Sequence, residues 1–130
     1  MAPALSGADA RPRASTPEVR KEIVATIEGQ LRAFRRGEVE KAHGFATADL
    51  RKQKPLPVLT AIVKQSYPEI WANTRAEFGI VRDDGNRATV TVQVYAKDAD
   101  AAYDFTLVKE AAGWRIHGVL RHEPKKAGKA

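Results

Sequence analysis

The sequence predicts an α+β domain in which three N-terminal helices pack on a curved, four-stranded antiparallel sheet. Three observations predict this class. Apolar residues recur at helical spacing up to about Ser66, whereas apolar and polar residues alternate from Arg75 onward, as in strands. One face of the alternating half is nearly all apolar, so we expect the helices to cover that face and leave the other to water or a partner.

The first expected helix spans residues 17–36. Thr16 offers an N-cap oxygen, Pro17 suits the first helical position, and Gly37 supplies a left-handed stop. A short second helix is expected over residues 38–47 and a third from Pro55 or Pro57 to Ser66, because Pro68 disfavours helical torsions at Tyr67.

Four strands are expected after the helices, the first over residues 75–82. The Asp84-Gly85-Asn86 turn joins it to a strictly alternating strand, "RATVTVQVYA", in a hairpin. Two further strands, "AYDFTLVK" and "WRIHGVL", complete the meander. In the last strand, alternation places four residues on the inward face, namely Trp114, Ile116, Gly118 and Leu120, and leaves Arg115, His117, Val119 and Arg121 outside.

One domain accounts for the chain, which has 130 residues. We expect a disordered leader over residues 1–15, which lack apolar periodicity, then a single domain over 16–122 and a basic flexible tail over 123–130. The absence of cysteine excludes disulfides and thiolate metal sites.

The formal net charge is +6, and about half of it falls in the two expected tails. Binding to nucleic acid is therefore disfavoured, because such binders concentrate charge on a folded face. No apolar run is long enough for a membrane span. The start has no signal peptide, so the chain is expected to be soluble: periplasmic or secreted if a signal peptide has been removed, and cytoplasmic otherwise.

Three segments resemble the nuclear-transport-factor-2-like superfamily: "IEGQLRAFRRGEVEKAHGFA", "AIVKQSYPEIW" and "GWRIHGV". More narrowly, they resemble a bacterial domain-of-unknown-function family within that superfamily, over about residues 18–121. The resemblance implies a cone of helices laid into a curved sheet, a cystatin-like roll. It implies little about activity, because the superfamily hosts both enzymes and binding modules.

The candidate ligand-binding residues lie on the apolar helix stripes, at the Tyr67–Trp71 bend and on the inward sheet face. They are Gln30, Phe34, His43, Tyr67, Trp71, Tyr103 and Trp114. His43 is also read as a half-buried core histidine, and the aromatic residues as packing at the end of the cone. No cofactor and no metal site is expected, because the three histidines have no ligand spacing.

His117 is expected outside, on a polar sheet face that could pair two copies of the chain in a homodimer. The residues assigned to this dimer face are Gln93, Tyr95, Asp104, Arg115 and His117. A β-bulge that shifts the register would instead turn His117 inward.

The leading hypothesis is a non-catalytic domain that binds a small apolar ligand or a protein partner, because the inward face holds almost no titratable groups. The alternative is a pocket enzyme of isomerase, cyclase or hydrolase type. That alternative requires His43 to meet Tyr67 or Glu69 in a cavity.

Overall fold

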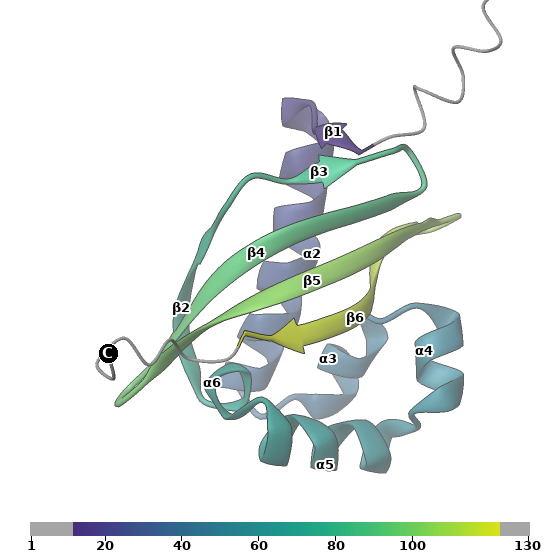
Figure 1. Cartoon of the computed structure of the whole chain (residues 1–130). Helices are drawn as coiled ribbons and strands as arrows, with labels where there is room; N and C mark the ends of the chain where they lie inside the picture. Colours follow the sequence, from purple (N-terminus) through teal and green to yellow (C-terminus); the bar gives the residue numbers. More distant parts are fainter. Residues whose placement is uncertain (1–11, 123–130) are drawn as a thin grey trace, which may run out of the picture.

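The computed structural model describes residues 12–122, which form an α+β domain with helices packed against a curved antiparallel sheet (Figure 1). Within these residues there are five helices and six strands, more than the three and four expected. The helices are α2 (Pro17–Arg35), α3 (Val39–Gly44), α4 (Ala48–Gln53), α5 (Leu56–Ser66) and α6 (Pro68–Trp71). The strands are β1 (Arg13–Ala14), β2 (Asn73–Phe78), β3 (Arg82–Asp83), β4 (Arg87–Ala96), β5 (Asp100–Glu110) and β6 (Gly113–Arg121).

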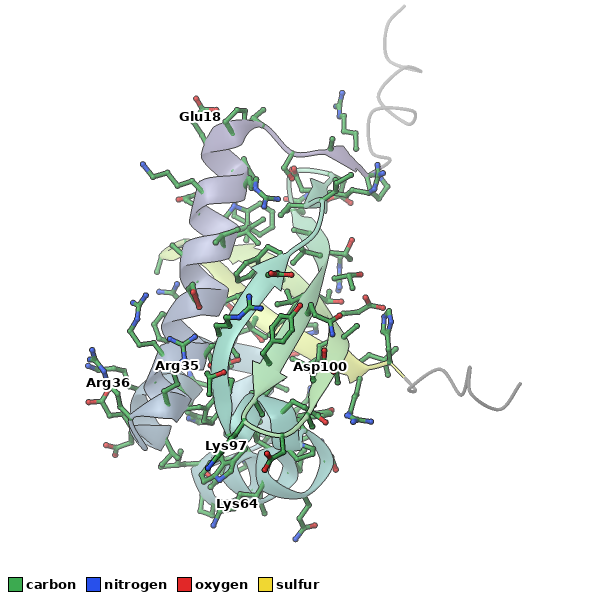
Figure 2. All side chains as sticks on the ribbon, turned by 90° about the vertical axis from the view of Figure 1, so that its left-hand side faces the viewer. Glu18, Arg35, Arg36, Lys64, Lys97 and Asp100 are labelled. Atoms are coloured by element: carbon green, nitrogen blue, oxygen red, sulfur yellow. The ribbon has the colours of Figure 1, made fainter. Side chains whose placement is uncertain are left out.

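Helix α2 begins at Pro17, as predicted, and ends at Arg35, one residue before the predicted end. The Thr16 side chain accepts a hydrogen bond from the Val19 amide at 3.2 Å, and Gly37 adopts a φ of 72° just past the end. Glu18 lies at its start, whereas Arg35 and Arg36 lie at its other end, which suits the helix dipole (Figure 2). Figure 1 shows α2 running across one face of the sheet.

The remaining helices are more broken than predicted. The expected second helix ends at Gly44, and Thr47 then caps a separate helix, α4, by accepting from the Leu50 amide at 3.1 Å. Helix α4 thus lies in the segment between the expected second and third helices. Pro68 starts one more short helix, α6, because proline is tolerated in a first turn.

Strands β4, β5 and β6 pair in sequence order as an antiparallel meander. The predicted hairpin turn precedes them, with Gly85 at a φ of 96°. Strands β2 and β3 both pair with β4, and β1 adds to β3 at the edge. The expected leader therefore overlaps β1 at Arg13–Ala14. Residues 1–11 of that leader, and the expected tail over 123–130, lie outside the described residues.

The expected strand over 75–82 is interrupted, because β2 and β3 contact β4 with registers that differ by one residue. Phe78 pairs with Val92 and Arg82 with Thr89, so the segment between them holds one residue more than its partner. Val81 is buried as a result, whereas Ile80, which unbroken alternation with Phe78 would place inside, is 64 % exposed.

A second bulge interrupts β6. Gly118 pairs with Thr106 and Ile116 pairs with Leu107, which leaves His117 as the extra residue. Trp114 and Ile116 face the core as predicted. Beyond the bulge, the residues predicted to point inward point outward, and those predicted to point outward point inward. Leu120 is 66 % exposed, whereas Arg121 pairs with the buried Tyr103 and shares its face. The predicted assignment of Leu120 to the inside and Arg121 to the outside is therefore wrong.

The core lies between α2 and the covered sheet face. Its largest fully buried side chains are Tyr103, Phe105, Ile23, Ile27, Leu31, Ile70, Leu107 and Ile116. Among residues 12–122, no helix combines the length and the apolar character needed to cross a membrane.

Candidate functional site

A cavity of about 170 Å³ lies between helix α5, helix α2 and strand β6; we call it the α5 cavity. Helix α5 contacts α3 and α6, so it closes this end of the fold over the sheet. The lining is mainly apolar and consists of Gln30, Phe34, Leu50, Lys54, Leu59, Ile62, Val63, Tyr67, Ile70, Ile116, Gly118 and Val119. The bulge contributes to it directly, because it brings Val119 to the inner side of β6.

Gln30 is the buried polar group of the cavity. It is 6 % exposed, and its amide Nε2 donates to the Ala42 carbonyl at 3.2 Å. Because a carbonyl can only accept, this contact fixes which end of the amide is nitrogen. No hydrogen bond from a described residue to the other end, Oε1, is found, and Oε1 is not among the fully buried unpartnered atoms, so it remains accessible. Gln30 therefore offers a free acceptor inside an apolar lining.

Lys54 is the only charged side chain among the described residues that line the cavity. Pro55 follows it and disfavours helical torsions, so α4 ends and Lys54 adopts a φ of −126°. The His43 Nε2–H donates to the Lys54 carbonyl at 2.9 Å and holds this backbone in place. No described carboxylate forms an ion pair with its ammonium group.

The predicted ligand-binding residues divide into two groups. Gln30, Phe34 and Tyr67 line the α5 cavity, and the Tyr67 hydroxyl donates to the Val119 carbonyl at 3.1 Å. The other four lie outside the lining: His43, Trp71, Tyr103 and Trp114. Trp71 packs on Phe34 with ring centroids 5.8 Å apart, and Trp114 is buried beneath α2. Sequence reasoning missed Lys54, because a lysine in a connector carries no signal of its own.

A buried ionic cluster ties α6 to the sheet. Glu69 is 5 % exposed, and Arg121 donates to both of its oxygens, at 2.9 and 2.7 Å. The Tyr103 hydroxyl donates to Glu69 at 2.6 Å. The hydrogen bond from Arg121 outweighs burial and lowers the pKa of Glu69 to about 2, whereas burial, followed by the hydrogen bond to Glu69, raises the pKa of Tyr103. Because the donors hold the carboxylate ionised, this cluster is suited to fixing α6 in place.

No described hydrogen bond joins the three residues of the enzyme alternative to one another. His43 bonds to Lys54, Tyr67 to Val119, and Glu69 to Arg121 and Tyr103. Of the three, only Tyr67 lines the α5 cavity. An acid or base must reach its substrate within hydrogen-bond distance, and neither His43 nor Glu69 lines the α5 cavity.

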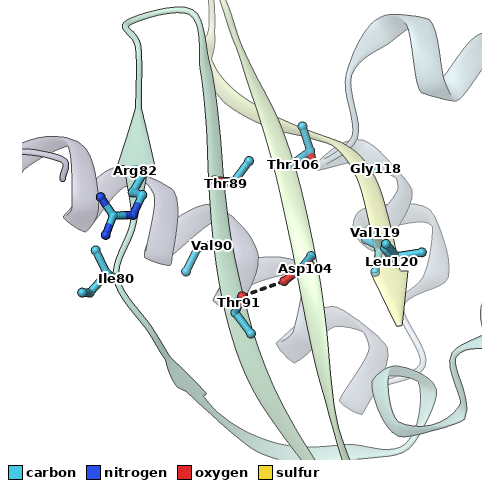
Figure 3. A pocket seen from close by; sticks show the side chains of 10 residues that line it. All are labelled: Ile80, Arg82, Thr89, Val90, Thr91, Asp104, Thr106, Gly118, Val119 and Leu120. Atoms are coloured by element: carbon cyan, nitrogen blue, oxygen red, sulfur yellow. Dashed lines mark hydrogen bonds between the residues drawn. The ribbon is translucent and has the colours of Figure 1, made fainter. Parts of the chain in front are cut away.

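The uncovered face of the sheet carries a shallow depression of about 660 Å³, which we call the outer trough (Figure 3). Its floor holds Thr89, Thr91, Asp104 and Thr106, with a 2.6 Å hydrogen bond from Thr91 to Asp104. Ile80 and Leu120 lie on opposite sides of the trough. Both are exposed because of the two bulges.

The predicted dimer face places only Asp104 in the outer trough. The other four residues lie outside the trough, namely Gln93, Tyr95, Arg115 and His117. All five make contacts within the chain, Asp104 with Thr91 and His122. Although His117 is the bulged residue, it lines neither the cavity nor the trough. Its Nδ1 lies 3.0 Å from the Thr47 hydroxyl, beside the bridge between Ala46 and Ile116.

Metal-binding side chains do not cluster: nowhere in residues 12–122 do three or more His, Asp or Glu gather to hold an ion.

A family model described as a domain of unknown function (DUF4864) matches residues 16–128, most of the chain. The comparison with curated proteins finds no match.

Proposed function

We propose that this chain, which belongs to the DUF4864 family of domains of unknown function, is a non-catalytic domain that binds a small apolar ligand in the α5 cavity. The observation that carries the proposal is the cavity itself, which is about 170 Å³ in volume and largely apolar in lining. For scale, an engineered apolar cavity of about 150 Å³ binds benzene. The α5 cavity is thus suited to a ligand built on about one ring. A cavity between helices and a curved sheet also agrees with the resemblance to the nuclear-transport-factor-2-like superfamily.

The test is calorimetric titration of the protein with two small apolar probes, toluene and indole. Val63 is buried and lines the cavity from α5, so Val63→Phe fills the space and should abolish binding. Val58 lies on the same helix, is 45 % exposed and does not line the cavity, so Val58→Phe is the matched control and should bind as the wild type does. Absence of binding by the wild type, or equal binding by both variants, would contradict the proposal.

A second candidate function is self-association through the outer trough. It is favoured by Ile80 and Leu120, which expose large apolar side chains on opposite sides of a polar floor. The trough also holds one cation, Arg82, and one anion, Asp104. In a two-fold arrangement each copy can present Arg82 to the partner's Asp104, as a self-complementary interface requires.

Sedimentation equilibrium over a concentration series tests this candidate. The wild type should populate a dimer that Ile80→Ser combined with Leu120→Ser dissociates. Val58→Ser removes a similarly exposed apolar group from α5 and should leave the dimer intact. A wild type that stays monomeric at every concentration removes this candidate and leaves the cavity proposal untouched.

A further inference from the structure

The polar groups that line the α5 cavity restrict the chemistry of its ligand beyond size and apolarity. Among the described residues that line the cavity, Lys54 alone carries a charged side chain, and Oε1 of Gln30 is an amide acceptor without a described donor. The Tyr67 hydroxyl already donates to Val119. A ligand that satisfies the lining therefore needs an anionic group and a hydrogen-bond donor, as well as an apolar body.

We propose that the ligand is a small organic acid: a carboxylate on a single-ring apolar body that also carries a hydroxyl or N–H donor. This inference rests on the proposed function. The carboxylate pairs with the Lys54 ammonium, the donor binds Gln30 Oε1, and the ring lies against Leu59, Ile62 and Val119.

The donor requirement follows from the position of Gln30 in the cavity lining. Its Oε1 has no described donor and is not among the fully buried unpartnered atoms, so water can reach it in the empty cavity. An acceptor that loses this water to a ligand without gaining a partner weakens binding, so a ligand lacking the donor is discriminated against. A ligand whose group at this position only accepts hydrogen bonds, such as a methyl ether, also leaves Gln30 Oε1 without a donor and should bind weakly. Because Nε2 is held by the Ala42 carbonyl, the amide cannot turn around to serve such a ligand without losing that bond.

The charge requirement follows from the placement of Lys54. The His43–Lys54 hydrogen bond and Pro55 fix the backbone from which the side chain extends. Its ammonium group has no described carboxylate partner to displace. An incoming anion therefore gains a charge-assisted contact without breaking an existing ion pair. His43 is in this account a positioning residue for Lys54.

The experiment is a calorimetric titration of the wild type with six probes. The first two, 3- and 4-hydroxybenzoate, present the donor at two distances from the carboxylate. Benzoate and 4-methoxybenzoate lack the donor, 4-hydroxybenzyl alcohol lacks the charge, and toluene lacks both. At least one hydroxybenzoate should bind about tenfold more tightly than 4-hydroxybenzyl alcohol, and about fivefold more tightly than benzoate or 4-methoxybenzoate.

Two variants assign each preference to its residue. Lys54→Met should remove the preference for the carboxylate and keep the preference for the hydroxyl. Gln30→Leu should remove the preference for the hydroxyl and keep the preference for the carboxylate. Near-UV circular dichroism of this variant checks that its core is intact. If Gln30→Leu does not fold, the wild-type comparison of the hydroxybenzoates with benzoate and 4-methoxybenzoate decides the donor requirement alone.

The outcomes separate the two proposals. Equal affinity for toluene, benzoate and the hydroxybenzoates would overturn the organic-acid inference and leave the apolar site standing. If neither toluene nor indole binds, the proposed function fails. If both Lys54→Met and Gln30→Leu still prefer the hydroxybenzoates to the other probes, the inference is also overturned, because residues other than Lys54 and Gln30 would then select the ligand.

Discussion

At the scale of single residues, Glu69 is the buried charge on which the position of helix α6 depends. Its carboxylate accepts three hydrogen bonds, two from Arg121 and one from Tyr103. Removing one partner of a buried pair costs about 3 kcal/mol or more, because the other partner is left uncompensated. The cluster was not predictable by alternation alone, which placed Arg121 outside.

Glu69→Gln should lower the free energy of unfolding by about 3 kcal/mol at neutral pH. The pKa of Glu69 is depressed in the folded state, from 4.5 to about 2. Its stabilisation is therefore fully present above about pH 4.5 and is lost as the pH falls toward 2. Urea denaturation at a series of pH values should show a larger acid-side loss in the wild type than in the variant, which keeps other carboxylates whose pKa values are lowered, such as Glu77, Asp84 and Asp104.

Glu77→Gln is the control, because Glu77 pairs with Arg75 on the surface. Water screens an exposed ion pair, so Glu77→Gln should change the free energy of unfolding little at any pH. The account would be contradicted if the two variants were equally stable, or if the pH profile of Glu69→Gln matched that of the wild type.

At the scale of elements, Gly29 sets how closely the segment after α3 can approach helix α2. A Cβ atom at this position would lie 2.5 Å from Cζ of Phe45. The ring can pack against α2 only because position 29 has no side chain. This contact fixes the chain just before Ala46 and Thr47 reach the edge of β6.

Gly29→Ala should therefore destabilise the protein by about 1–3 kcal/mol, although alanine is the better helix former. Gly44→Ala is the matched comparison, because a Cβ atom there meets nothing within 4 Å. That change should be neutral or stabilise by up to about 1 kcal/mol. Thermal and urea unfolding measure both changes, and a stabilised Gly29→Ala variant would show that Phe45 does not pack as described.

The two bulges mark the limit of what periodicity could predict. Helix α2 and the β4–β6 meander follow directly from apolar spacing, alternation and the Asp84-Gly85 turn. Alternation, however, assumes an unbroken register, and each bulge adds one residue that reverses the face of everything beyond it. A glycine lies at each interruption, Gly79 and Gly118, and an isolated glycine within a strand pattern is a recognised bulge signal.

At the scale of the whole molecule, the β6 bulge lies between the two candidate surfaces. Gly118 and Val119 line both the α5 cavity and the outer trough. The sequence predicted Gln30, Phe34 and Tyr67 as ligand-binding residues, since they lie on the first helical stripe and at the Pro68 bend. It could not predict Lys54, whose position depends on where α4 ends and on the His43 contact.

Methyl NMR of protein labelled at Ile, Leu and Val tests the claim that the α5 cavity is the binding site. Toluene bound there should shift the methyl signals of Leu59, Ile62, Val63 and Ile70, which line the cavity. The signals of Ile80 and Leu120, in the outer trough, should stay in place. Shifts confined to Ile80 and Leu120, or no shifts as toluene approaches saturation, would contradict the claim.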